Sequence, residues 1–254
     1  MLKVHIKPAL NDNYIFVIED TKTKEAICVD PAKAEPVNQI LKEHSLNLKY
    51  IFNTHHHYDH VGANLELKEA HKCEVVAYAG DLERIPGHDI AVKDGDLFPF
   101  GEHQFEILYT PGHTLGHIAF FSREENLLFC GDTLFSIGCG RLFEGSPQQM
   151  WNSLKSLKSL GDNITVYCTH EYTLSNLKFA LSLAPNWPGL KEYSDLCEAK
   201  RSKGEATVPT LLKREKTLNP FLLCDNADYV ETLGMTGKKA SEVLKEIRLL
   251  KDNF

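Results

Sequence analysis

The segment 54–60 constrains this chain more than any other stretch, because it reads Thr-His-His-His-Tyr-Asp-His. Five of its seven residues carry side chains that can bind a metal ion. The apolar run Tyr50–Phe52 precedes the segment, as in a buried strand, and Val61–Ala63 follows it, where we expect a helix to begin. A turn of this kind lies at the edge of a sheet, where a rigid scaffold places functional side chains. The segment therefore predicts a metal site at the end of a buried strand.

The composition is that of a globular protein with an acidic balance. A chain of 254 residues suffices for one large domain, or for a large domain with a small one. Hydrophobic residues make up 43%, which is enough for a substantial core. The formal net charge is -7, whereas a protein that binds nucleic acid favours a basic surface. We therefore expect no nucleic-acid partner, although a local group of cations would still admit a small anionic substrate.

The cysteines argue against disulfide bonds and against a thiolate zinc site. The chain has seven, an odd number, and no two are spaced as Cys-x-x-Cys. This usage is typical of buried, unpaired thiols in a reducing compartment.

No apolar run approaches the ~20 residues of a membrane span, and the first residues lack the pattern of a signal peptide. We therefore expect a soluble, cytoplasmic protein that has no membrane partner, and we take a monomer as the default.

Strand patterns dominate the first part of the chain, and helical patterns dominate the last part. Short apolar runs bounded by turn residues predict strands over residues 14–18, 26–29, 50–53, 74–78, 105–109, 117–122, 127–130 and 164–168. Ser146 and Pro147 predict a helix start, because serine caps a helix and proline fits its first position. Past residue 172 strand patterns nearly vanish, and helices are expected over 190–203 and 241–251. We expect a mixed α/β domain over 1–172 and a small helical domain over 173–254.

Further candidate ligands also follow strands. His55, His113, Asp132 and His170 each lie within a few residues of the end of a predicted strand. If those strands belong to stacked sheets, their ends converge on one edge, and the scattered residues form one site.

Seven donors are too many for one metal ion. A catalytic zinc takes about three protein ligands and keeps one position open. The natural division gives each of two ions three ligands of its own: His55, His57 and His113 for one, and Asp59, His60 and His170 for the other. Asp132 has two carboxylate oxygens and is expected to bridge the two ions together with a hydroxide.

Such a centre predicts hydrolysis. Two ions about 3.5–4 Å apart lower the pKa of a shared water, polarise a carbonyl group and stabilise the oxyanion formed on attack. An ester, thioester, amide or phosphoester would serve as substrate, and no nucleophilic Ser or Cys is required. Asp132 and Asp59 are the expected catalytic carboxylates, with Asp59 also orienting the nucleophile. His56 is interpreted as structural, and the role of His117 stays open between orienting a ligand and bonding a loop.

Four motifs resemble those of the metallo-β-lactamase superfamily: Thr-His-His-His-Tyr-Asp-His at 54–60, Pro-Gly-His-Thr-Leu-Gly-His at 111–117, Gly-Asp-Thr-Leu-Phe at 131–135 and Thr-His-Glu-Tyr-Thr at 169–173. More narrowly, the chain is similar to the glyoxalase II (hydroxyacylglutathione hydrolase) family. The resemblance implies an αββα sandwich with a small C-terminal helical domain. It also implies two metals at one edge of the two sheets. The His and Asp donors suit divalent zinc, iron and manganese, and we expect zinc first, with iron or manganese as alternatives. The ligand positions of the family map onto the same seven residues.

The resemblance also implies a substrate. The ending Arg-x-x-Lys-Asp-x-Phe resembles that of glyoxalase II chains, which implies that Arg248 and Lys251 bind the glycine carboxylate of glutathione. Arg141 and Tyr172 match further substrate-binding positions. Phe143 stands where some members have a tyrosine, so one hydroxyl is missing. The implied reaction is hydrolysis of S-(2-hydroxyacyl)glutathione, chiefly S-D-lactoylglutathione, to glutathione and D-lactate, the second step of methylglyoxal detoxification.

Several alternatives stay open. Other enzymes of the superfamily include a persulfide dioxygenase, which uses one iron and lacks this ending, and β-lactamases, lactonases and general thioesterases. The well-known dinuclear zinc β-lactamases carry a cysteine where Asp132 stands. A tRNA-processing nuclease would need a basic arm. A non-catalytic metal-binding module would saturate its metals, which seven donors for two ions do not do.

Overall fold

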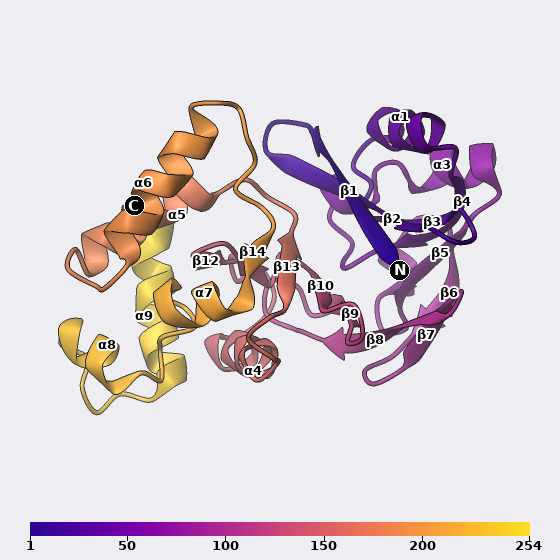
Figure 1. The fold of residues 1–254 in the computed structure, drawn as a ribbon. Coiled ribbons are helices and arrows are strands. Elements are labelled where there is room, and N and C mark those ends of the chain that lie inside the picture. Colours follow the sequence, from indigo (N-terminus) through magenta and orange to yellow (C-terminus); the bar gives the residue numbers. More distant parts are fainter. The chain divides into compact units, whose positions relative to one another are not determined.

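Strands make up most of one part of the chain, and helices most of another (Figure 1). The computed structural model describes residues 1–254 and divides into two units. The first unit comprises residues 1–109 and 116–131, and the second comprises residues 110–115 and 132–254. No helix combines the length and the apolar character that crossing a membrane requires. The predicted domain boundary after residue 172 stays a prediction.

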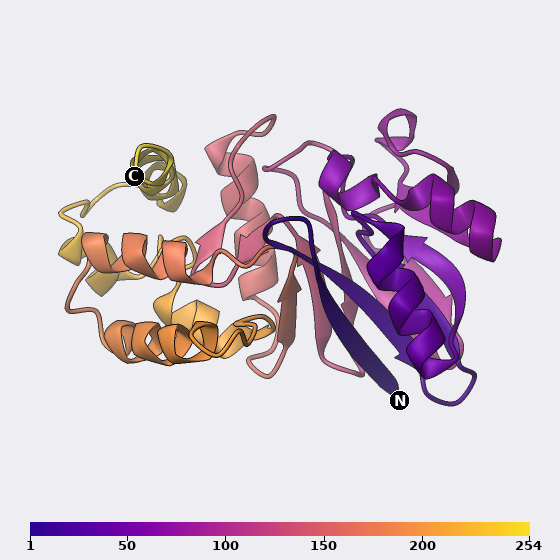
Figure 2. The same ribbon diagram turned by 90° about the horizontal axis from the view of Figure 1, so that it is seen from above.

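The first unit contains a six-stranded sheet. Its strands, in spatial order, are β1 (Leu2–Ala9), β2 (Asn13–Asp20), β3 (Glu25–Val29), β4 (Asn47–Phe52), β5 (Glu74–Tyr78) and β6 (His88–Val92). The strands β1 to β3 pair antiparallel, whereas β3 to β6 pair parallel. Parallel neighbours need a crossover, and α1 (Ala34–His44) and α3 (Asn64–His71) provide two of them. Both helices pack on one face of the sheet, over an apolar core (Figures 1 and 2).

A second group of strands covers the other face of this sheet. It consists of β7 (Leu97–Phe100), β8 (His103–Tyr109), β9 (Ile118–Ser122) and β10 (Leu127–Gly131), all paired antiparallel. Aromatic rings join the two layers: Phe52 stacks on Phe120 with ring centroids 4.1 Å apart, and Phe16 lies 5.8 Å from Phe129. All eight residues of β2 are buried, as expected of a strand covered on both faces. The short helices α2 (Tyr58–Val61) and η1 (Leu82–Arg84) lie in connecting loops.

The second unit is mostly helical. Its helices are α4 (Pro147–Lys158), α5 (Thr173–Leu183), α6 (Leu190–Arg201), α7 (Leu212–Leu218), α8 (Ala227–Thr232) and α9 (Ala240–Asp252). Its strands are the short pairs β11 (Leu134–Phe135) with β12 (Gly138–Cys139), and β13 (Thr165–Cys168) with β14 (Thr210–Leu211). Helix α9 packs against α4, and α5 packs against α6 (Figure 2).

Most of the predicted elements are present. Ser146 forms the predicted cap: its hydroxyl accepts from the Gln149 N–H at 3.2 Å, and the Gln149 side chain accepts from the Ser146 N–H at 2.9 Å. Strand β1 was not predicted, although its apolar residues Leu2, Val4 and Ile6 alternate with polar ones as in a half-buried strand. The short elements β6, β7, β11, β12, β14, α7 and α8 were not predicted as separate elements either. The expected class, α/β sheets flanked by helices with a helical C-terminal region, is confirmed.

Candidate active site

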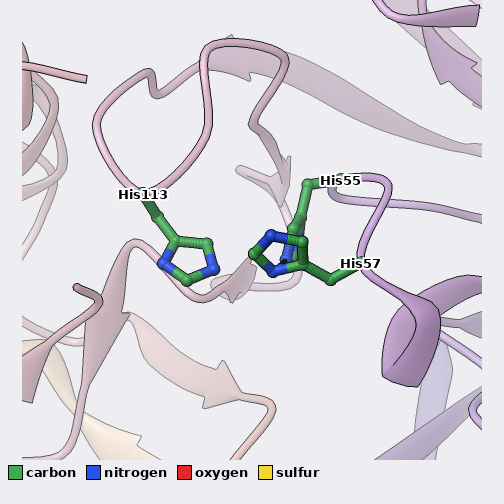
Figure 3. Close-up of side chains that lie close together, drawn as sticks. All are labelled: His55, His57 and His113. Carbon is green, nitrogen blue, oxygen red and sulfur yellow. Dashed lines mark hydrogen bonds between the residues drawn. The ribbon is translucent and has the colours of Figure 1, made fainter. Parts of the chain in front are cut away.

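In the first unit, the turn after β4 and the helix α2 that follows it carry four candidate metal ligands. Strand β4 ends at Phe52, and α2 begins at Tyr58, so the turn between them presents His55 and His57. The His55 Nε2 and His57 Nδ1 atoms lie 3.0 Å apart. Figure 3 shows both rings on this turn, together with His113 on the loop that follows β8. The helix α2 adds Asp59 and His60, and the His60 ring lies 4.1 Å from that of His55.

A buried aspartate at the end of β3 orients two of these histidines. Asp30 accepts hydrogen bonds from the Thr54 N–H at 2.8 Å, the Thr54 hydroxyl at 2.7 Å and His60 Nδ1 at 2.9 Å. The single hydroxyl proton of Thr54 is donated to Asp30, so this oxygen accepts from His55 Nδ1 at 3.1 Å. In both rings Nδ1 therefore carries the proton, and Nε2 is the nitrogen that can bind a metal.

Asp30 was not among the predicted site residues. An aspartate after a strand is a common turn residue, and nothing in the sequence distinguishes Asp30 from one. Both of its side-chain oxygens accept hydrogen bonds from the ligand turn. The sequence does not reveal this role. The other support that was missed is Asn13, whose amide donates to Asp59 Oδ2 at 3.0 Å and to the Asp59 carbonyl at 3.3 Å.

Two further histidines of the first unit have distinct surroundings. His56 bonds through Nδ1 to Asp81 at 3.2 Å and through Nε2 to Arg84 at 3.2 Å, so it anchors the turn to the loop after β5. His117, whose role the sequence left open, stacks on His55 with ring centroids 4.8 Å apart. It therefore packs against a candidate ligand and contributes to the placing of that ring.

The second unit supplies the other three donors. His113 Nε2 lies 3.5 Å from Asp132 Oδ2, and His170 Nε2 lies 3.4 Å from Asp132 Oδ1. The two carboxylate oxygens of Asp132 thus face different imidazoles, the arrangement that a bridging carboxylate requires. His113 Nδ1 donates to the Arg141 carbonyl at 2.9 Å, so Nε2 is again the nitrogen for a metal. All three residues are buried.

The donor set fits divalent metals of the zinc type. It consists of imidazole nitrogens and carboxylate oxygens, with no thiolate, and the donors fall into candidate metal-binding groups. Imidazole with carboxylate suits zinc, iron and manganese. The number of donors and the two-sided Asp132 suggest a dinuclear centre.

A cavity of about 750 Å³ in the second unit adjoins two of the donors. It is lined by the donors His113 and Asp132 and by all five residues predicted to bind substrate: Arg141, Phe143, Tyr172, Arg248 and Lys251. These residues come from the loop after β12, from the residue that precedes α5, and from α9. The C-terminal helix therefore faces the same cavity as two candidate metal ligands.

The cavity is rich in cations. Arg248 is buried, donates to the Cys139 carbonyl at 2.9 Å and pairs with Asp252 at 3.0 Å. Its Nε is buried and has no hydrogen-bond partner within the chain. Burial, aided by Arg248, Arg141 and Lys178, lowers the pKa of Lys251 to about 8. Positive charges so close together favour an anion.

Four aromatic side chains line the cavity: Phe135, Phe143, Tyr172 and Phe254. Tyr172 stacks on His170 with a centroid distance of 4.8 Å and an interplanar angle of 3°. Phe143 is 62% exposed and meets the His113 ring edge-on at 5.2 Å. Phe254 and Lys178 also line the cavity, and the Lys178 ammonium lies 5.7 Å from the centre of the Phe254 ring. Lys178 was not predicted, because a single lysine on α5 carries no pattern that distinguishes it from a solvated surface residue.

Comparisons with known proteins match both parts of the chain. The model of the metallo-beta-lactamase superfamily matches residues 10–170, and that of the hydroxyacylglutathione hydrolase C-terminus matches residues 171–254. Hydroxyacylglutathione hydrolase of Rhodospirillum rubrum is 46% identical over 253 residues, covering 100% of this chain and 99% of the relative. That of Methylococcus capsulatus is 46% identical over 254 residues, with the same coverage.

Solved structures agree on the fold. ETHE1 from Myxococcus xanthus is 23% identical, with a TM-score of 0.67 over 98% of this chain and 96% of its own. TTHA1623, solved in a di-iron-bound form, is 25% identical, with a TM-score of 0.62 over 87% of this chain and 100% of its own. The full-length relatives and both family models agree, and the chain therefore belongs to the hydroxyacylglutathione hydrolase family of the metallo-β-lactamase superfamily.

Proposed function

We propose that this protein hydrolyses S-(2-hydroxyacyl)glutathione, chiefly S-D-lactoylglutathione, to glutathione and D-lactate. The observation that carries the proposal is the cavity of the second unit, because it is lined both by cations suited to a carboxylate and by the donors His113 and Asp132. The relatives that share the whole chain are named for the same substrate class.

The proposed centre holds two divalent ions. One would be bound by His55, His57 and His113, the other by Asp59, His60 and His170, with Asp132 shared between them. The ions would lower the pKa of water and polarise the thioester carbonyl. We assign zinc to the site, with iron and manganese as ions that the same donors accept.

The residues around the donors have definite tasks in this proposal. Asp30 keeps His60 protonated at Nδ1 directly and His55 through Thr54, and the Arg141 carbonyl does the same for His113. Asn13 holds the Asp59 carboxylate, which would orient the attacking water. Such partners fix the tautomer and the direction of each donor before substrate arrives.

Arg248 and Lys251 would bind the glycine carboxylate of glutathione, with Arg141 and Tyr172 along the rest of the tripeptide. Arg248 lines the cavity, so its guanidinium would offer N–H donors to one carboxylate oxygen. Phe143 offers an apolar face and no hydroxyl. The departing group is a thiolate, and thiols have a pKa of about 8.5, so it leaves without a strong general acid.

The proposed setting is a reducing one. All seven cysteines are buried and unpaired, as expected of a cytoplasmic enzyme. We propose that the enzyme acts as a monomer.

The test is a thioester assay with S-D-lactoylglutathione, run with metal analysis on the same preparation. We expect thiol release and about two metal ions per chain, a count set by the donor number. Glutathione persulfide, followed by oxygen uptake, tests the dioxygenase alternative. Metal-replete protein that does not cleave the thioester would overturn the proposal.

A further inference from the structure

The hairpin formed by β11 and β12 has a strained turn. Two residues, Ser136 and Ile137, join Phe135 to Gly138, and Ile137 has a φ of 57°. A β-branched residue is an outlier in this left-handed region, which favours glycine and asparagine. Ile137 is also completely buried, so its backbone N–H cannot turn to solvent. Something outside the hairpin must hold this conformation.

Three buried side chains bind the backbone of the turn. Glu215 Oε2 accepts from the Ile137 N–H at 2.8 Å. Asn219 donates to the carbonyls of Phe135 at 3.1 Å and Gly138 at 3.0 Å. From α5, the Asn176 amide donates to the Ser136 carbonyl at 3.0 Å.

Glu215 is the centre of this network. Asn219 also donates to Glu215 Oε2 at 3.0 Å, and the Thr210 hydroxyl donates to Oε1 at 2.8 Å. Both Glu215 and Asn219 are fully buried. A buried carboxylate is costly unless its oxygens accept hydrogen bonds, and here both oxygens do. A buried glutamate that serves only packing would be replaced at less cost by an apolar residue.

The hairpin ends at the cavity, which Cys139 lines. The Cys139 carbonyl accepts from Arg248 Nη1 at 2.9 Å, and the Arg141 carbonyl, two residues on, accepts from His113 Nδ1 at 2.9 Å. The conformation of 137–139 thus sets where the acceptor for Arg248 lies.

We propose that Glu215, with Asn219, is a positioning residue for glutathione recognition: it fixes the strained hairpin 134–139 so that the Cys139 carbonyl holds Arg248 in the cavity. This inference rests on the proposed function, because it assigns Arg248 to the glutathione moiety. Glu215 itself is not among the residues that line the cavity.

The test compares three variants of the full-length, metal-loaded protein. Glu215→Ala removes the acceptor of Ile137, and Glu215→Gln keeps one oxygen for Ile137 and Asn219 while its amide donates to Thr210. Val230→Ala, a buried residue of α8 outside the network, is the control for lost stability alone. Each variant is assayed on S-D-lactoylglutathione and on the N-acetylcysteamine thioester of D-lactate, which lacks the glycine carboxylate. The assays are run well below the melting temperature of each variant.

We expect Glu215→Ala to raise KM for the glutathione thioester about tenfold, which corresponds to about 1.4 kcal/mol of binding. Its kcat/KM for the N-acetylcysteamine thioester should stay within about threefold of the unaltered enzyme, less than the loss of one such contact. Glu215→Gln should restore most of the KM. Equal losses on both substrates, or a KM unchanged from that of Val230→Ala, would overturn the inference.

Hydrogen exchange separates this inference from the proposed function. Glu215→Ala should speed exchange of the amides of 134–139, Glu215→Gln should restore their protection, and Val230→Ala should leave them protected. This readout needs no substrate, so it stands even if the unaltered enzyme fails to cleave the thioester. Unchanged exchange in Glu215→Ala would show that the hairpin does not depend on Glu215.

Discussion

The two units present their donors in different ways. In the first unit the four donors fall within residues 55–60, and Asp30 and Asn13 hold them from neighbouring strands. In the second unit, His113, Asp132 and His170 come from three separate loops, and the same unit carries the cation-rich cavity. In the proposed function, the first unit would contribute to the chemistry alone, whereas the second would contribute both to the chemistry and to the choice of substrate.

This difference makes a testable division. Substitutions around the donors of the first unit should slow hydrolysis of every thioester by a similar factor. Substitutions in the cavity should affect glutathione thioesters and spare small ones. Asp132 lies in the second unit, but its proposed role is in the chemistry. A substitution of Asp132 therefore tests this division most directly.

The largest effect is expected for Asp132→Ala. Removing a carboxylate whose oxygens face His113 and His170 should lower kcat on the order of a thousandfold, as when a preorganised group at the reacting atoms is lost. The metal content should fall as well. Asp132→Asn keeps the shape without the charge and should lose nearly as much. Full activity of the alanine variant, measured with metal analysis, would rule out the two-metal reaction.

Asp30→Asn should have the next largest effect. The amide cannot accept from both the Thr54 N–H and His60 Nδ1 as the carboxylate does, so His60 and His55 lose their fixed tautomers. Loss of such a partner costs roughly ten- to a hundredfold in metal affinity or activity. Kinetics on glutathione and N-acetylcysteamine thioesters should show the same factor for both. A loss confined to the glutathione thioester would break the comparison between the units.

Replacing both Arg248 and Lys251 by alanine tests the cavity of the second unit, where we expect an effect on glutathione thioesters only. We expect KM for S-D-lactoylglutathione to rise roughly ten- to thirtyfold, the scale of one or two charge-assisted hydrogen bonds. Hydrolysis of the N-acetylcysteamine thioester should change little. Lys245→Ala is the matched control, because Lys245 is an exposed lysine of the same helix that does not line the cavity. A KM equal to that of the control would show that this face of α9 does not bind glutathione.

The sequence predicts the two units unequally for a physical reason. The donors can be recognised by their residue type and by their position after predicted strands. Because the turn 54–60 is a local segment, periodicity and spacing suffice to predict it. The residues that orient them, Asp30 and Asn13, are ordinary turn and strand residues until the fold brings them to His60 and Asp59. Glu215 is still less visible, because it lies 78 positions from its partner Ile137 on a helix whose pattern alone indicates a charged, solvated surface.

The smallest effect concerns the charge of Lys251. Because its pKa is lowered to about 8, the ammonium is present at pH 7 and is lost as the pH rises through 8. KM for the glutathione thioester should therefore rise about threefold between pH 7 and 9, the scale of a partly exposed ion pair. Binding of the anion should be accompanied by proton uptake near pH 8, which calorimetry in buffers of different ionisation enthalpy measures. Lys251→Arg keeps its charge throughout this range and should flatten the profile. A profile that keeps its slope in the arginine variant would assign the titration to another group, and the cavity would then recognise its anion through Arg248 and Arg141 alone.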